Sequence, residues 1–139
     1  MLVLSAARLE AACTVSATGV SFGSYDILSP TPDDSTGSIV ILCSPGDKNI
    51  QVSLSTGSSG TYTARTLVNG SDVLLYNLYS DAARTVVWGD GTGGTSVLLI
   101  PNWTGGRKPK TYVIYGRMPA QQNAAAGTYA DSIVVTVDF

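Results

Sequence analysis

The chain has 139 residues, the length of one ordinary domain, and it is 44% apolar and only 13% charged. Its net charge of −2 gives no basic surface for binding a nucleic-acid backbone. The sequence contains no histidine, so the commonest general base, the commonest metal ligand and a Ser-His-Asp triad are all missing. Composition therefore disfavours an enzyme and a nucleic-acid-binding protein.

The first twelve residues are typical of the end of a secretory signal segment. Leu2–Leu4 are apolar, and the small residues Ala11 and Ala12 precede Cys13 as they would precede a signal-peptidase site. A short N-terminal extension is the alternative interpretation of residues 1–12. No other stretch is long and apolar enough to span a membrane. We therefore expect a secreted protein without a transmembrane segment.

Cys13 and Cys43 are the two cysteines of the chain, and they form no CxxC motif. Two cysteines at this spacing are too few for a zinc site. In an oxidising compartment they predict one disulfide, which would stabilise the fold by about 3–4 kcal/mol through loop closure. A pair of buried free thiols remains the alternative.

The rest of the chain predicts β-strands joined by turns, with almost no helical pattern. Turn chemistry recurs at Ser44–Asp47, Val68–Ser71 and Gly89–Gly91. Many short strands with turns between them indicate one all-β sandwich or barrel domain. In chain order, the predicted strands are 13–22, Gly37–Cys43, Asn49–Ser55, Val73–Tyr79, Thr85–Trp88, Ser96–Ile100, Thr111–Met118 and Tyr129–Phe139.

The last predicted strand has the most regular alternation. Ile133, Val135, Val137 and Phe139 share one face, and this apolar face continues to the final residue of the sequence. Such a strand is either internal to a sheet or an edge that awaits a partner strand.

Several motifs occur together between Cys13 and Phe139. They are Tyr76-Asn77-Leu78-Tyr79-Ser80-Asp81-Ala82-Ala83-Arg84-Thr85, Trp88-Gly89-Asp90-Gly91-Thr92-Gly93-Gly94-Thr95, Tyr115-Gly116-Arg117-Met118-Pro119, Ala125-Ala126-Gly127-Thr128-Tyr129-Ala130-Asp131 and Val135-Thr136-Val137-Asp138-Phe139. With the early cysteine pair, they make the chain resemble the spore coat protein U domain, the subunit domain of archaic chaperone–usher pili.

This resemblance implies an immunoglobulin-like β-sandwich over residues 13–139 that lacks its final strand. A periplasmic chaperone would lend a strand to the open groove, and assembly at an outer-membrane usher would replace it with the N-terminal extension of a neighbouring pilus subunit. Ile133, Val135, Val137 and Phe139 would contact the donated strand. The resemblance implies no catalytic residue, metal or cofactor. The protein would pass through the periplasm to a cell-surface pilus.

The stretch before Cys13 departs from the expected pattern of a strand donor. Cleavage near Ala11 or Ala12 would leave almost nothing before Cys13, and residues 1–12 alternate poorly. A subunit that accepts a strand but donates none belongs at a filament end. We therefore expect a tip or terminal subunit.

Two other functions compete with a pilus subunit. A secreted carbohydrate- or surface-binding module would use exposed aromatic side chains, with Trp103 and Tyr112 as one patch and Trp88 as a further contact. A hydrolase would need two carboxylates facing each other across a cleft.

The charged side chains of the loops have simpler interpretations. We expect Asp81 and Arg84 to form a salt link that caps a turn. Asp90 alone offers too few oxygen ligands for calcium. The basic cluster Arg107–Lys110 is interpreted as a solvated loop beside a strand edge.

Overall fold

A computed structural model describes the backbone of residues 2–6 and the whole of residues 13–104 and 106–139. The cleavage site predicted at Ala11 and Ala12 lies outside the described residues. The described residues form strands and one 3-10 turn. In chain order these are β1 (Leu2–Ala6), β2 (Cys13–Thr18), β3 (Asp33–Cys43), β4 (Lys48–Leu54), η1 (Gly57–Ser59), β5 (Arg65–Asn69), β6 (Asp72–Tyr79), β7 (Leu98–Asn102), β8 (Lys110–Met118) and β9 (Asp131–Asp138).

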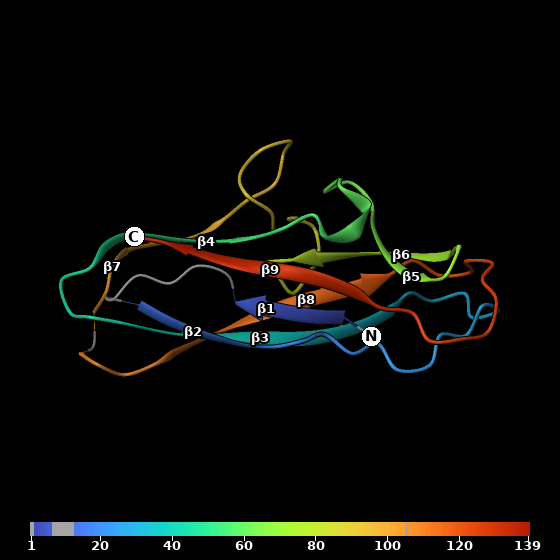
Figure 1. The fold of residues 1–139 in the computed structure, drawn as a ribbon, viewed down its shortest axis with the longest axis horizontal. Coiled ribbons are helices and arrows are strands. Elements are labelled where there is room, and N and C mark those ends of the chain that lie inside the picture. Colours follow the sequence, from blue (N-terminus) through green and yellow to red (C-terminus); the bar gives the residue numbers. More distant parts are fainter. Residues whose placement is uncertain (1, 7–12, 105) are drawn as a thin grey trace.

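The strands form two sheets that pack face to face (Figure 1). One sheet has the order β1-β9-β4-β7, and the other has the order β2-β3-β8-β6-β5. Every ladder between neighbouring strands is antiparallel except the β1–β9 ladder, which is parallel. The predicted all-β sandwich is confirmed. No helix in the described part of the chain is long and apolar enough to cross a membrane.

Alternating sequence patterns explain how the core is filled. In β4, Ile50, Val52 and Leu54 point inward while the residues between them face solvent or the rim. In β9, Ile133, Val135 and Val137 do the same from the neighbouring strand. These branched side chains lie on the inner face of one sheet, and burying them against the other sheet supplies much of the hydrophobic stabilisation of such a sandwich.

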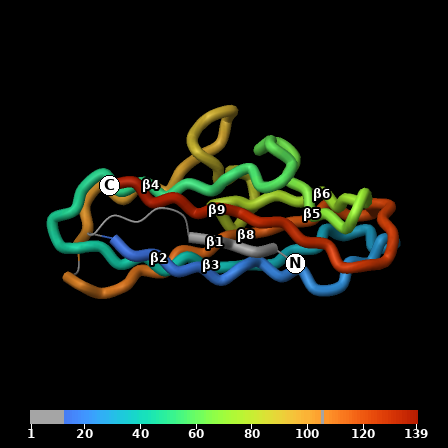
Figure 2. Tube along the Cα trace, in the orientation of Figure 1, coloured from blue at the N-terminus to red at the C-terminus, as the bar shows by residue number. Residues whose placement is uncertain are grey.

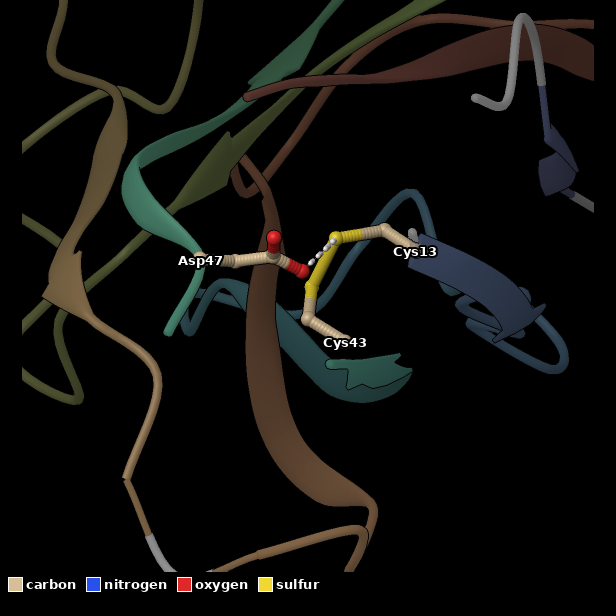
Figure 3. Close-up of side chains that lie close together, drawn as sticks. All are labelled: Cys13, Cys43 and Asp47. Carbon is tan, nitrogen blue, oxygen red and sulfur yellow. Dashed lines mark hydrogen bonds between the residues drawn. A yellow bond between two sulfur atoms is a disulfide. The ribbon is translucent and has the colours of Figure 1, made fainter. Parts of the chain in front are cut away.

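The predicted disulfide is confirmed: Cys13 of β2 lies directly opposite Cys43 of β3, and their sulfur atoms are bonded (Figure 3). An Asp47 carboxylate oxygen lies 4.0 Å from Sγ of Cys13. The same oxygen accepts a hydrogen bond of 2.9 Å from the backbone N–H of Ser44, so Asp47 caps the β3–β4 turn. Because both sulfurs are used in the disulfide, this cluster offers no thiolate to a metal ion.

The structure differs from the predicted strands in several places, including the following three. The strand β5 was missed because it begins with Arg65, a charged residue that is fully buried here. The segment Thr85–Trp88 forms only isolated bridges, from Val87 to Tyr79 and from Trp88 to Ser96. The strand predicted at Ser96–Ile100 is β7 and begins two residues later.

The N-terminal segment holds a strand that was not among the predicted ones. Leu2–Ala6 form this strand and belong to the sandwich. Whether residues 1–12 are a signal remnant or a short N-terminal extension stays a prediction. Their weak alternation gives no strand signal, so only the tertiary structure places this backbone beside β9.

Candidate functional site

The candidate site is the edge of β9 that faces away from β4. On one side, residues Gln51–Leu54 of β4 pair with β9 in antiparallel register. On the other side, Leu2–Ala6 pair with Asp131–Val135 in parallel register. A strand edge exposes unpaired backbone N–H and C=O groups, which bind any chain that adopts an extended conformation. Here the segment β1 covers five residues of that edge, from Asp131 to Val135.

The site lies where the two sheets of the sandwich come together along one side. The edge strand of the opposite sheet is β2, and β1 lies between β9 and β2 (Figure 1). On the inward side of β2, Val15 and Ala17 are partly buried and pack against the core. Ile39 and Ile41 of the neighbouring strand β3 lie beside them and are fully buried. The backbone of β1 therefore lies along the boundary of an apolar interior.

Three of the four predicted groove residues lie on β9 as expected. Ile133, Val135 and Val137 are buried on the inward face of β9. Phe139 differs, because β9 ends at Asp138 and the Phe139 side chain is 39% exposed. Whether these four residues contact a donated strand stays a prediction.

A buried arginine fixes the sheet that faces β9. Arg65 is fully buried, and its guanidinium donates to the carbonyl oxygens of Ser55 and Trp88 and to Oδ1 of Asn77, at 2.7–3.1 Å. The Tyr62 ring lies over it, with the guanidinium carbon 5.3 Å from the ring centroid. Burial lowers the pKa of Arg65, and the surrounding phenol and carboxyl groups partly offset this effect. These bonds satisfy the buried charge.

A second buried polar pair anchors the start of β9. The Tyr76 hydroxyl donates a 2.5 Å hydrogen bond to Oδ2 of Asp131, the first residue of β9. Oδ1 of Asp131 accepts hydrogen bonds of 2.9 Å from the backbone N–H groups of Ser58 and Ser132. Burial and the bond to Asp131 raise the pKa of Tyr76 well above its usual value. The phenol therefore stays protonated and remains a donor.

Gly57 allows the turn η1 to approach this pair closely. Its φ is +71°, and a β-carbon there would lie 2.2 Å from Oδ2 of Asp131. No sequence pattern predicted these contacts of Arg65, Gly57 and Asp131. The one indication in the sequence is that Asn77, Trp88 and Asp131 fall within the motifs that carry the family resemblance.

Motif residues that are far apart in the sequence therefore meet in two buried groups. Tyr76 bonds Asp131 of β9, and Asn77 and Trp88 both accept from Arg65. Trp88 also donates from Nε1 to the carbonyl oxygen of Val52 in β4, the neighbour of β9, at 3.0 Å. The family model described as Spore Coat Protein U domain matches residues 1–136. The chain belongs to the Spore Coat Protein U domain family. These family motifs build the scaffold that holds β9.

Two further comparisons accompany the family match. The chain is 35% identical over 85 residues to Protein U of Myxococcus xanthus, a stretch that covers 60% of this chain and 45% of that protein. The chain thus spans less than half the length of this curated relative.

A solved chain with a similar fold comes from the CsuC–CsuE chaperone–tip adhesion subunit pre-assembly complex of the archaic chaperone-usher Csu pili of Acinetobacter baumannii. The TM-score is 0.61 and the identity is 24%, over 91% of this chain and 39% of that one. This likeness concerns the fold alone.

The prediction of an aromatic binding patch was wrong about exposure. Trp103 is only 3% exposed, because its ring packs into the core and its Nε1 donates to the carbonyl oxygen of Gly106 at 2.9 Å. The Lys110 ammonium lies 4.7 Å from the centroid of that ring. Tyr112 is half-buried against the core, and Trp88 is also buried. Neither tryptophan presents a free face for stacking on a sugar.

The loop charges act on their own backbone or on neighbouring strands. Asp81 caps its turn by accepting from the N–H groups of Thr85 and Val86, as expected. The predicted salt link to Arg84 was wrong, since Arg84 forms its ion pair with Asp34 at 3.6 Å. The reason is that Asp34 lies on β3, next to β8, where the guanidinium also donates to a strand carbonyl.

Proposed function

We propose that this domain is a structural subunit of a chaperone–usher pilus that is completed by a donated β-strand and has no enzymatic role. The observation that carries the proposal is the pairing of Leu2–Ala6 along the free edge of β9. An extended segment separated from β9 by most of the chain supplies a strand of the sheet. A segment from another chain with the same backbone could supply it too.

The energetics of strand addition suit this edge. Backbone hydrogen bonds to β9 give affinity for any extended segment, and the apolar interior behind the edge selects for alternating apolar side chains. Ile133, Val135 and Val137 lie at this position and are our candidates for contact with a donor. In parallel pairing, the bonds are slightly less stable per residue than in antiparallel pairing.

The proposal assigns three kinds of partner to this edge. A periplasmic chaperone would cover it during transit, an outer-membrane usher would be the place of exchange, and a neighbouring pilus subunit would occupy it in the filament. The resulting location is the cell surface. A position at the tip or the end of the filament stays a prediction.

The test is exchange of β1 for a strand supplied in trans. A fluorescent peptide with the sequence of residues 1–12 is incubated with the full chain, and incorporation is followed by size-exclusion chromatography. The chain with Val3→Pro and Leu4→Pro serves as acceptor beside the natural chain. Adjacent N–H groups of a strand point to opposite sides, so the double substitution removes one N–H that faces β9.

We expect the proline variant to incorporate the peptide at least tenfold faster than the natural chain, because its own β1 competes less well. The matched control is a peptide that carries the same two prolines, which should not be incorporated. A variant that stays folded, as judged by circular dichroism, and still takes up no peptide would rule out strand exchange at β9.

A further inference from the structure

The end of the sandwich opposite the C-terminus holds a cavity that the proposed pilus function does not use. Its volume is about 600 Å³, which lies in the range of small-molecule sites. Three segments form its walls: residues 21–27 between β2 and β3, Leu67 and Leu74 of the β5–β6 hairpin, and residues 124–129 between β8 and β9. These segments gather at the same end of the molecule (Figure 2).

The lining of this cavity carries no charge and is more apolar than polar. Phe22, Leu67, Leu74 and Met118 present the core side of the cavity, and none of the lining residues in the described chain is Asp, Glu, Lys or Arg. Asp26 lies between two lining residues, but its carboxylate accepts the backbone N–H of Leu28 at 2.9 Å. A ligand would therefore meet mainly apolar surface with some hydroxyl groups, rather than an ion-pairing group.

The walls are tied to one another by hydrogen bonds. The Tyr25 hydroxyl donates to the carbonyl oxygen of Pro119 and accepts from the backbone N–H of Gln122, which joins two loops that are distant in sequence. The Gln122 side chain bonds both the N–H and the C=O of Leu75 at 2.7 and 2.8 Å, which joins the second loop to β6. These bonds join the segments that carry the walls, so a ligand would not have to bring those segments together.

We propose that this cavity is a binding site for a small, uncharged and predominantly apolar molecule. Its three walls, its volume and its charge-free lining all favour that class of ligand. The lining tyrosine Tyr25 uses its hydroxyl within the framework, so affinity would come from burial of apolar surface. Ile27 at the cavity and Leu28 beside it, which are 41% and 80% exposed, extend the apolar surface outward. This inference does not depend on strand donation to β9.

The experiment is a titration of the full chain with the neutral fluorophore phenylnaphthylamine, excited directly. We expect saturable binding with one probe per chain. Two substitutions from opposite walls, Ser24→Trp and Ala126→Trp, place bulk in the cavity at residues whose side chains are exposed and outside the core. Each should weaken binding of the probe at least tenfold.

The matched control is Val113→Trp, which adds the same side chain on the exposed face of β8, away from the cavity. It should bind the probe as the natural chain does. Thermal unfolding of each variant confirms that it is folded. The proposal is overturned if the natural chain shows no saturable binding, or if both cavity variants bind the probe as tightly as the control.

Discussion

The hydrogen bond between Tyr76 and Asp131 fixes the first residue of β9, and its removal can be predicted quantitatively. Tyr76→Phe keeps the buried ring and deletes only the hydroxyl. Oδ2 of Asp131 then loses its 2.5 Å hydrogen bond inside the protein, while Oδ1 keeps the two backbone donors. A hydrogen bond to a charged group contributes about 1.5–3 kcal/mol, and an unsatisfied buried partner keeps its desolvation cost.

The expected shift in melting temperature follows from the chain length. With 139 residues and an unfolding entropy of about 2.1 cal/mol/K per residue, each kcal/mol lowers Tm by about 3 °C. Tyr76→Phe should therefore lower Tm by about 5–10 °C at neutral pH. Chemical denaturation should show a lower midpoint with an unchanged slope, because the fold stays the same.

The same bond has a defined alkaline signature. Burial and the bond to Asp131 raise the pKa of Tyr76 in the folded chain above the value of 10.0 of a free phenol. The advantage of the natural chain over Tyr76→Phe is therefore fully present below about pH 10. It shrinks as the pH rises further, because the unfolded chain releases the Tyr76 proton first.

Differential scanning calorimetry between pH 7 and pH 11 measures both effects. The control is Tyr112→Phe, which removes a hydroxyl from a half-buried ring that packs against the core. It should change stability by less than about 0.5 kcal/mol. A Tyr76→Phe variant with the stability of this control would refute the view that the Asp131 pair anchors β9.

Other features of the scaffold lead to further predictions. Replacing Cys13 and Cys43 by alanine should cost about 3–4 kcal/mol in urea unfolding, and the natural chain with reductant should match the double variant; equal stability with and without reductant would contradict this. Gly57→Ala should lower stability by about 1–2 kcal/mol or more, since φ is positive there and the methyl group would collide with a carboxylate; an unchanged Tm would exclude that collision. Hydrogen bonding from Arg117 lowers the pKa of Asp34 in the folded chain, so the ion pair stabilises the fold above about pH 3.8 and this stabilisation is lost as the pH falls below that value. Asp34→Asn should therefore make stability fall less steeply with acid, and an unchanged acid dependence would argue against the pair.

The sequence by itself determined the fold class and most of the core. Period-two alternation identified β4 and β9, because one face of each strand is buried and the other is not. The disulfide was predictable as one of two alternatives, since two cysteines in a secreted chain are expected to pair. The family motifs were recognisable as well, although no local pattern explained why they occur together.

The tertiary structure supplied that reason. Arg65 looks like a surface residue in sequence, and it is buried only because carbonyl oxygens from two distant segments converge on its guanidinium. Trp103 looked exposed beside a basic loop, yet its ring closes the core. Such placements depend on contacts between segments far apart in the chain, which a local pattern does not encode.

At the edge of β9, the sequence predicted one part of the structure and the tertiary contacts decided the other. Alternation predicted that Ile133, Val135 and Val137 face inward, and it raised the choice between an internal strand and an edge awaiting a partner. Only the tertiary structure decided that Leu2–Ala6 cover this edge in parallel register. The physical reason is that strand pairing uses backbone groups, which every residue carries, so a segment with weak side-chain alternation can still complete a sheet.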